Sequence, residues 1–214
     1  MNQEGALDIV YRDDAIVLVN KPGGLLAVPG RGPDKQDCVE SRLRALFPDC
    51  IKQPAVHRLD MGTSGLMVLA LTAEAHRGLS MAFESRSITK RYVAVLEGEV
   101  QASAGEIQLA FRPDPDNRPY QVYDPVNGKT GITRWRKIDC FAGRTRVEFM
   151  PQTGRTHQLR LHASHPKGLG CPIVGDSLYG SGEQGNPMLL HASGLQFSHP
   201  VTGQVVCFFS SAPF

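Results

Sequence analysis

Residues 57–60, which read H-R-L-D, combine the side chains best suited to chemistry in this chain. They place the carboxylate of Asp60 beside the cation of Arg58 and the imidazole of His57, and an apolar run at residues 66–71 follows closely. A charge between apolar segments is costly to desolvate unless it is paired, and proteins tolerate that cost mainly where chemistry needs it. The alternative is an aspartate that only caps a loop through backbone amides. The spacing leaves both interpretations open.

Two more polar clusters could supply partners for that carboxylate. Lys90 lies two residues before Tyr92 at the start of a predicted strand, and Arg155 precedes a predicted helix that contains Arg160. If the clusters converge, a carboxylate, a guanidinium and a phenol ring together suit a planar, polar ring attached to a phosphodiester chain. Each side chain also has a simpler interpretation. Tyr92 is then a half-buried strand aromatic, and Arg155 closes an ordinary ion pair.

Other kinds of chemistry are disfavoured by spacing. His157 and His162 are five residues apart, which is wrong for one helical face, so we expect no metal. Ser64 lacks the G-x-S-x-G frame of a serine hydrolase. The five cysteines share no metal-type spacing, and free thiols in a reducing cytoplasm are the simplest interpretation. Lys21 is expected to end a strand and anchor a loop rather than to catalyse.

Composition limits the class of protein. The chain has 214 residues, 41% of them hydrophobic, which is enough for one large domain, and we expect a single domain over residues 1–214. It has no apolar run long enough to span a membrane and begins with a polar segment, so we expect a cytoplasmic protein. Residues 86–160 hold 13 Lys and Arg against 8 Asp and Glu. This excess fits a polyanionic partner, although charge alone favours a solvated basic face.

The N-terminal third predicts the elements that would position these clusters. Apolar runs at residues 9–11 and 16–19, separated by a polar turn, indicate a hairpin. A helix is expected to begin at a capping box around Asp37 and to end before the next proline. Residues 66–71 indicate a buried strand, and Thr72 is placed to cap a second helix.

The rest of the chain predicts more strands than helices, without regular alternation, which favours an α+β fold with a largely antiparallel sheet. The strand at residues 132–138 has no cleanly apolar face, so we expect it beside a wet cleft or a ligand. Further strands are expected at residues 92–96, 147–150 and 205–209. A helix is expected from Thr156 to about His162, and loops are expected at residues 113–119 and 181–187.

Residues 57–60 together with residues 63–65 resemble the signature of the RluA family of pseudouridine synthases. Five further segments resemble the family's other motifs in the same order, at residues 20–22, 90–94, 154–160, 172–176 and 189–192. The resemblance runs from about residue 9 to the C-terminus. Two departures exist. The connection at residues 162–171 is longer than in many members, and we expect no accessory RNA-binding domain before the hairpin.

The resemblance implies a fold and a reaction. The fold is a bent, mainly antiparallel mixed sheet in two halves, flanked by helices, with an RNA-binding cleft between the halves. The reaction isomerises uridine in RNA to pseudouridine: the base is detached from the ribose, turned, and rejoined through carbon 5. No cofactor or metal is implied.

The resemblance also implies roles for individual residues. Asp60 matches the catalytic carboxylate, Tyr92 the aromatic residue that stacks on the target base, and Arg155 the arginine that pairs with the aspartate. A role for Tyr92 in removing the carbon 5 proton stays open, because a phenol is a poor base at neutral pH. Arg58 matches the arginine that helps to fill the space left by the flipped base, with a plain phosphate contact as the alternative. Further RNA contacts are expected from His57, Lys90 and Arg160.

The expected partner is RNA, as a stem-loop of large-subunit ribosomal RNA, a transfer RNA anticodon arm, or both. No membrane and no DNA partner is expected, and the chain is expected to be a monomer. Two other functions remain open: an RNA-binding protein without activity, and a nucleoside glycosidase. The presence of Asp60, Tyr92 and Arg155 argues against the first, and the central arginine excess argues weakly against the second.

Overall fold

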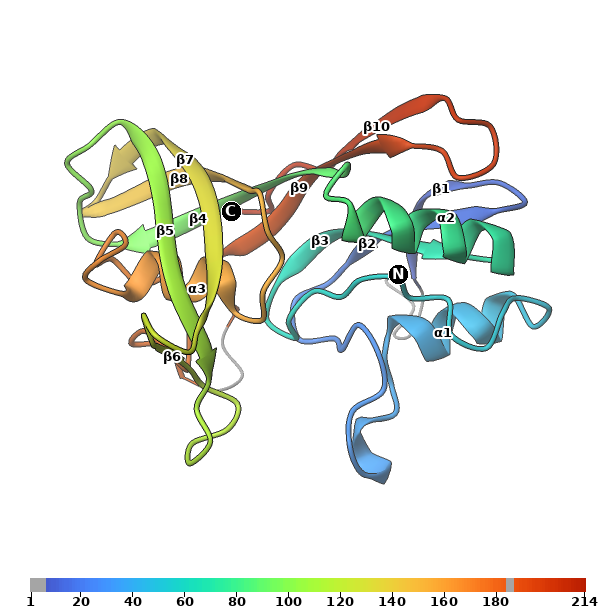
Figure 1. Cartoon of the computed structure of the whole chain (residues 1–214), viewed down its shortest axis with the longest axis horizontal. Helices are drawn as coiled ribbons and strands as arrows, with labels where there is room; N and C mark the ends of the chain where they lie inside the picture. Colours follow the sequence, from blue (N-terminus) through green and yellow to red (C-terminus); the bar gives the residue numbers. More distant parts are fainter. Residues whose placement is uncertain (1–6, 184–186) are drawn as a thin grey trace. The chain divides into compact units, whose positions relative to one another are not determined.

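The computed structural model describes residues 7–183 and 187–214 (Figure 1). Contacts group the chain into two compact units. Unit 1 comprises the residues up to Lys90 together with His191–Pro213, and unit 2 comprises Arg91–Leu190 together with Phe214. The expectation of one domain over residues 1–214 stays a prediction.

Unit 1 contains a sheet of mostly antiparallel strands with the order β1-β2-β3-β9, in which β10 also pairs with β9. The pairing of β3 with β9 is parallel. Helix α2 packs on β2 and β3 through Ala75 and Leu79, which share a buried apolar cluster with Leu18 and Val68. The elements of unit 1 are β1 (Asp8–Arg12), β2 (Ile16–Lys21), η1 (Pro33–Lys35), α1 (Val39–Leu46), β3 (Ser64–Ala70), α2 (Ala73–Glu84), β9 (Leu190–Ser198) and β10 (Val205–Phe209).

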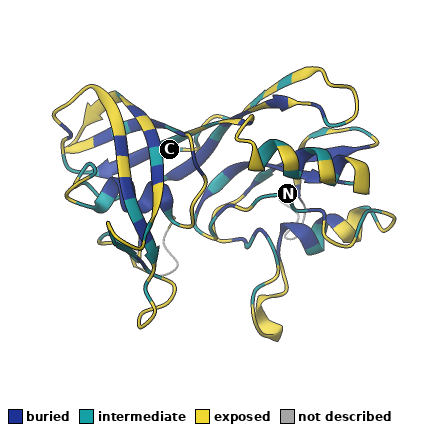
Figure 2. Cartoon of the chain, viewed as in Figure 1, coloured by how far each residue is buried: buried dark blue, intermediate teal, exposed yellow. Residues whose placement is uncertain are grey.

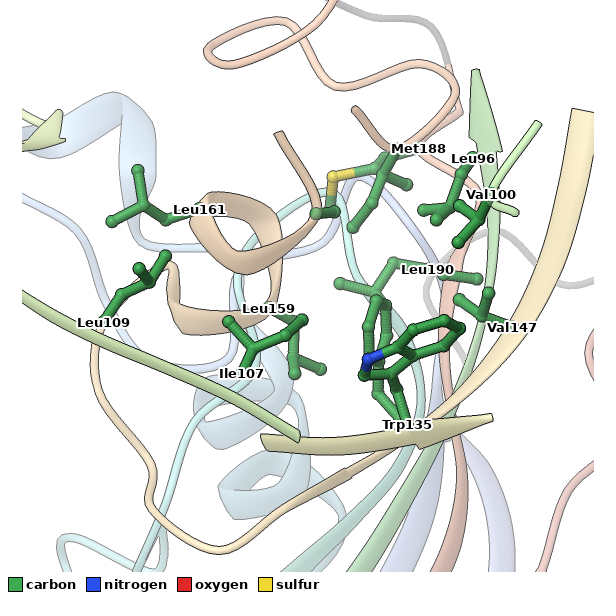
Figure 3. Close-up of a cluster of buried hydrophobic side chains, with 14 of the residues drawn as sticks. Leu96, Val100, Ile107, Leu109, Trp135, Val147, Leu159, Leu161, Met188 and Leu190 are labelled. Carbon is green, nitrogen blue, oxygen red and sulfur yellow. The ribbon is translucent and has the colours of Figure 1, made fainter. Parts of the chain in front are cut away.

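Unit 2 contains antiparallel strands in the order β4-β8-β7-β5-β6. One face of this sheet is covered by α3, whose Leu159 and Leu161 pack with Ile107, Leu109 and Trp135 in the main apolar core (Figure 3). The elements of unit 2 are β4 (Thr89–Glu97), β5 (Ala104–Pro113), β6 (Gln121–Tyr123), β7 (Lys129–Phe141), β8 (Arg144–Pro151) and α3 (Gln158–Ser164).

The predicted mainly antiparallel α+β fold is confirmed, and so are most of its elements. The hairpin is β1–β2, and the buried strand after the H-R-L-D segment is β3. Thr72 caps α2, since its hydroxyl accepts a hydrogen bond from the Ala75 backbone amide at 3.2 Å. Of the polar clusters, residues 57–60 lie in the loop before β3, whereas Lys90 and Tyr92 lie on β4 and Arg160 lies on α3.

Two predicted helix starts are wrong. The N-cap of α1 is Cys38 rather than Asp37, and Ser41 completes a capping box with it. Helix α3 begins at Gln158 and is not capped by Thr156. Its N-cap is His157, which adopts a left-handed backbone with φ 55°. Local sequence favoured Thr156 because hydroxyl residues are good caps, but His157 is held by a contact with a residue distant in sequence, described below.

The strand predicted at residues 132–138 lies within the longer β7. Thr133 and Trp135 face the core and are buried, whereas Arg134 and Arg136 are exposed on the other face. One face of this strand therefore does pack on an apolar core, which the alternation with a threonine and a lysine concealed. The loop expected at residues 181–187 lies partly outside the described residues, and β5 and β6 were not predicted.

Candidate active site

Asp60 lies on a tight turn that leads into β3, and several hydrogen bonds hold this turn. The Asp60 carbonyl accepts from the Thr63 amide at 3.1 Å. The next carbonyl, that of Met61, accepts from the Gly24 amide at 2.8 Å and from the Lys21 ammonium at 3.1 Å. The backbone of the turn is thus fastened to the Lys21 side chain at the end of β2 and to the segment after it, whatever the side chain of Asp60 binds.

Lys21 is the main anchor of this turn. Its side chain is 0% exposed, and Nζ donates to the carbonyls of Pro22, Leu25 and Met61 at 2.9, 2.7 and 3.1 Å. These three bonds use all three donors of an ammonium group. Burial lowers the pKa of Lys21 to about 8, and the charge of Asp60 partly opposes that shift. The expected role of Lys21, to anchor a loop, is confirmed.

A chain of polar side chains supports the other end of the Asp60 turn. His191 is buried and hydrogen-bonds Ser64 through Nδ1 at 2.9 Å and Ser210 through Nε2 at 3.1 Å. Ser210 in turn donates to the side chain of Asn20 at 3.3 Å. Gly65, with φ 108°, lets β3 approach β9 closely, because a Cβ there would lie 2.4 Å from the Ala192 carbonyl oxygen. The Asp60 turn, β9 and the segment after β10 are therefore linked by side-chain hydrogen bonds.

His57 and Arg58, adjacent in sequence, lie in different environments. The His57 ring stacks on Phe83 at 4.5 Å between centroids, and its Nε2 accepts from the Val68 amide at 3.1 Å. Burial and then the nearby charge of Lys90 lower the pKa of His57 to about 3, so the ring is neutral at pH 7. Arg58 is exposed. His57 thus ties its loop to β3 and α2, whereas the cation next to it faces solvent.

Lys90, the last residue of unit 1 before unit 2 begins, is half-buried near the start of β4. Its pKa is lowered, first by burial and then by the charge of Arg86. The same lysine contributes to the lowered pKa of His57. Asp60, Arg58, His57 and Lys90 therefore belong to one unit with Lys21, and this part of the predicted set is placed on one scaffold.

In unit 2 a buried glutamine holds the segment that carries Arg155. The side-chain oxygen of Gln158 accepts from the Arg155 amide at 3.0 Å and from the Thr153 hydroxyl at 2.7 Å. Its amide nitrogen donates to the Ile132 carbonyl at 3.1 Å and to the Thr133 hydroxyl at 2.9 Å. All four hydrogen-bonding positions of the side chain are used. The backbone at Arg155 is thus pinned to β7, while its side chain is exposed.

Arg160 is not a surface arginine. It is 7% exposed and makes two parallel hydrogen bonds to Asp176, at 2.7 and 2.6 Å. Asp176 also accepts from the amides of Leu178 and Tyr179, and together with Arg160 these contacts keep its pKa low despite burial. The guanidinium lies over the Tyr179 ring at 5.2 Å. Arg160 therefore fixes the loop after residue 172.

Tyr179 explains the unusual start of α3. Its hydroxyl accepts from the Gln121 amide at 2.8 Å and hydrogen-bonds Nδ1 of His157 at 2.9 Å. This contact holds His157 in its left-handed backbone conformation. Such a conformation costs about 1–3 kcal/mol and persists only where the surroundings enforce it. The turn between Arg155 and α3 is therefore set by a residue more than twenty positions away.

Tyr92 lies on β4, half-buried, and packs against the unit 2 core. Its register partner on β8 is Phe149. Tyr92, Arg155 and Arg160 thus share unit 2, and Asp60 belongs to unit 1. The predicted meeting of Asp60 with Tyr92 and Arg155 joins residues of the two units and stays a prediction.

Sequence reasoning assigned no role to three polar residues that the structure makes central. Gln158, Asp176 and His191 are all buried. Gln158 lies within the helix predicted from Thr156, and the other two lie in segments noted for their resemblance. The signal that could have found them is a polar residue among apolar neighbours, as in L-L-H-A at residues 189–192, which is costly to bury without partners.

The described residues offer neither a metal-binding group nor a membrane-spanning helix. No group of three or more His, Cys, Asp or Glu residues within residues 7–183 and 187–214 could hold a metal ion. Within the same part of the chain, no helix is both long and apolar enough to cross a membrane.

Comparison with known proteins decides the family. The family model described as RNA pseudouridylate synthase matches residues 15–165. The chain belongs to this family. The sequence resemblance is therefore confirmed, and the chain is an isomerase that converts uridine in RNA to pseudouridine. RNA as the substrate is confirmed at this level as well.

Curated relatives agree with this assignment over nearly their whole length. A "Dual-specificity RNA pseudouridine synthase RluA" from Haemophilus influenzae is 41% identical over 215 residues, covering 99% of this chain and 95% of the relative. The Escherichia coli K12 protein of the same description is 41% identical over 216 residues, covering 99% and 96%.

Solved structures of pseudouridylate synthases share the fold. "Human RNA Pseudouridylate Synthase Domain Containing 1" aligns with a TM-score of 0.80 at 31% identity, over 100% of this chain and 86% of that chain. "Human RNA Pseudouridylate Synthase Domain Containing 4" aligns with a TM-score of 0.75 at 26% identity, over 96% and 88%. The pseudouridine synthase fold predicted from the sequence is confirmed.

Proposed function

We propose that Asp60 is the catalytic carboxylate of this pseudouridine synthase and that Tyr92 and Arg155 complete its active site. One observation supports Asp60 above all. It lies on a turn anchored by a fully buried lysine, and its charge acts on that lysine. Such an arrangement keeps a carboxylate in one position relative to a bound substrate, which an aspartate that only caps a loop does not need.

The reaction requires a carboxylate at the sugar. Breaking the glycosidic bond of uridine develops positive charge on the ribose, and an adjacent carboxylate stabilises that charge or bonds to it. Two routes are available to Asp60, which are a covalent bond to the sugar and assistance in removing a ribose proton. In both cases the detached uracil has to stay in place, turn, and rejoin through carbon 5, so water has to be excluded from the pocket.

Tyr92 and Arg155 have complementary roles in this proposal. Tyr92 stacks on the target base, and its half-buried ring on β4 suits a platform that does not move. Arg155 pairs with the Asp60 carboxylate and orients it. The anchored backbone at Arg155 supports this role, because Gln158 fixes the point from which the exposed side chain extends.

The target uridine has to leave its stack before it can react, at a cost of about a few kcal/mol in a duplex and less in a loop. Arg58 is exposed and adjoins the anchored loop, so it is placed to contact the RNA or fill the vacated space. Lys90 is a second candidate for RNA contact. The neutral ring of His57 and the Asp176-paired guanidinium of Arg160 support positioning roles for these two residues instead.

The substrate is proposed to be a compact RNA stem-loop. Both bacterial relatives are described as dual-specificity enzymes, so we expect this chain to modify uridines in more than one RNA. A loop of large-subunit ribosomal RNA and a transfer RNA anticodon arm are the candidates, recognised by shape and by unstacked bases. The enzyme is proposed to act in the cytoplasm as a monomer.

A label-release assay tests the proposal. RNA carrying tritium on carbon 5 of uridine should lose label to water while the chain mass stays unchanged, since isomerisation replaces that hydrogen with the glycosidic bond. Label that stays in place would indicate a binding protein, and release of free base would indicate a glycosidase. Mapping pseudouridine in total RNA from cells with and without the protein then identifies the targets.

The variant Asp60→Asn tests the role of the carboxylate. It should abolish label release and largely keep RNA affinity, which phosphate contacts dominate. Lys52→Gln, an exposed lysine of unit 1, serves as a control that should retain release. Near-normal turnover by Asp60→Asn would show that another group carries the chemistry.

A further inference from the structure

The face of the unit 2 sheet that lies opposite the apolar core carries a group of arginines. On β7, Thr133 and Trp135 point into the core, so Arg134 and Arg136 point away from it. Alternating exposed and buried residues mark this strand in Figure 2. We call the outward set, which consists of Arg91, Arg134, Arg136, Glu106 and Glu148, the arginine face.

The strand register places these residues side by side. Glu106 on β5 pairs directly with Arg134, and Glu148 on β8 pairs directly with Arg136. Paired residues of antiparallel strands share a face, so both couples lie on the side away from α3. Arg91, at the start of β4, reaches the same glutamate across the sheet. Five charged groups from four strands thus form one surface.

The ion pairs leave part of each arginine available. Arg136 binds Glu148 through Nε at 2.6 Å, and Arg134 binds Glu106 through Nε at 3.1 Å. Arg91 contacts the second Glu148 oxygen at 3.4 Å. Arg134 and Arg136 use the inner nitrogen of the guanidinium in these ion pairs, which leaves the two terminal nitrogens of each as further donors. Terminal nitrogens are the donors that grip phosphate in a two-point contact.

The cations are more exposed than the anions. The side chains of Arg91, Arg134 and Arg136 are 46%, 65% and 59% exposed, whereas those of Glu148 and Glu106 are 10% and 37% exposed. An approaching ligand therefore meets guanidinium groups with carboxylates behind them. Arg134 and Arg136 are two residues apart on one strand, about 7 Å, a separation that neighbouring phosphates of one RNA strand can bridge.

We propose that the arginine face is an RNA-binding surface that contacts the phosphate backbone of the substrate outside the base pocket. The inference rests on the proposed function, which supplies RNA as the polyanion. All three cations are arginines, and arginine is the residue that matches phosphate geometry. The contact is with the backbone, so it adds affinity and not base specificity. A face of merely solvated ion pairs is the outcome that the experiment has to separate from it.

Substitutions of opposite sign in one ion pair make that separation. Arg134→Gln and Glu106→Gln each remove the same ion pair, so a purely structural pair predicts the same small change in melting temperature and no change in RNA binding. An RNA-binding face predicts opposite changes in binding. Arg134→Gln should weaken binding roughly fivefold, and Glu106→Gln, which releases the cation, should strengthen it.

The measurement is the dissociation constant of the full chain for a stem-loop RNA with uridines in its loop, taken over a salt series. Arg134→Gln should reduce the slope of log K against log salt by about 1. The matched control is Arg42→Gln, which removes an arginine on α1 that is paired with Asp37. It should leave the dissociation constant and the salt slope unchanged. The KM for label release should rise by the same factor as the dissociation constant.

Equal binding by Arg134→Gln, Glu106→Gln and the Arg42→Gln control would overturn the proposal. Its failure is distinct from failure of the proposed function. If unmodified protein releases label and the three variants bind alike, the isomerase stands and the arginine face does not. If Asp60→Asn retains near-normal turnover but the opposite changes in binding appear, the face stands and the assigned catalytic residues do not.

Discussion

In unit 1 the turn that carries Asp60 is anchored by the buried ammonium of Lys21, which binds three carbonyl oxygens. In unit 2 the segment that carries Arg155 is anchored by the buried amide of Gln158, and Arg160 on the helix that follows forms a buried ion pair with Asp176. The first anchor has an ionisable charge with no carboxylate bonded to it among the described residues, and its pKa falls to about 8. In unit 2 the buried charge of Arg160 is balanced by that of Asp176. Both units thus place a polar anchor beneath a candidate catalytic residue, but they meet its desolvation cost in different ways.

The comparison predicts its largest effect at the charge pair of unit 2. Arg160→Met should lower the free energy of unfolding by about 3–5 kcal/mol, because it leaves the Asp176 carboxylate buried without its cation. The double variant Arg160→Met with Asp176→Leu should recover much of that loss. Urea unfolding of the single and double variants measures both. A double variant less stable than either single variant would mean that the pair does not behave as a unit.

A smaller effect is expected at Lys21. Lys21→Met takes one donor from each of three carbonyls, of which that of Met61 keeps the Gly24 amide, while it also removes an ammonium whose desolvation is costly, so we expect a net loss of about 2 kcal/mol. Label release should fall roughly tenfold, because the Met61 carbonyl beside Asp60 loses one of its two hydrogen bonds. Urea unfolding and the release assay measure these changes, with the exposed Lys52→Met as control. Equal results for the two variants would remove Lys21 from the site.

The amide of unit 2 should show a split between activity and stability. Gln158→Leu keeps the side-chain size but removes the acceptor of the Arg155 amide and of the Thr153 hydroxyl, at a cost of about 1–2 kcal/mol. If Gln158 positions Arg155, kcat should fall by more than the RNA dissociation constant rises. Gln158→Glu, which keeps the acceptor oxygen for the Arg155 amide, should retain more activity than Gln158→Leu. A change in stability alone, with kcat unaltered, would limit Gln158 to a structural role.

The smallest effect concerns pH and a buried histidine in α3. Burial lowers the pKa of His162 to about 4, below the value of about 6.5 in the unfolded chain. The unfolded chain therefore binds a proton first, and stability falls as the pH drops from about 6.5 toward 4, by about 1 kcal/mol at pH 6. His162→Leu should flatten this part of the pH profile relative to unmodified protein, measured by urea unfolding. An unchanged slope would assign the acid sensitivity to other groups, among them His57 in unit 1.

The sequence was sufficient for those elements whose signals are local. The two apolar runs at residues 9–11 and 16–19, the apolar run that became β3, and the hydroxyl of Thr72 are each read from neighbouring residues, and each was confirmed. The start of α3 failed for the opposite reason. Its geometry depends on a hydrogen bond between His157 and Tyr179, which no local pattern contains.

The same distinction applies to the candidate site. The motif residues, and with them the family and its reaction, could be read from the order of residue types along the chain. The role of Arg160 could not. In the sequence it is one more cation in a basic segment, and only its bidentate contact with Asp176 reveals a buried anchor.

What the sequence alone determined is therefore the set of chemical groups: a carboxylate, a phenol, guanidiniums and the apolar strands around them. The tertiary structure decided which polar groups are buried and what satisfies them, as with Lys21 on three carbonyls and Gln158 on β7. The physical reason is that hydrogen bonds and desolvation act through space. Their energy depends on atoms that only folding brings within about 3 Å of one another.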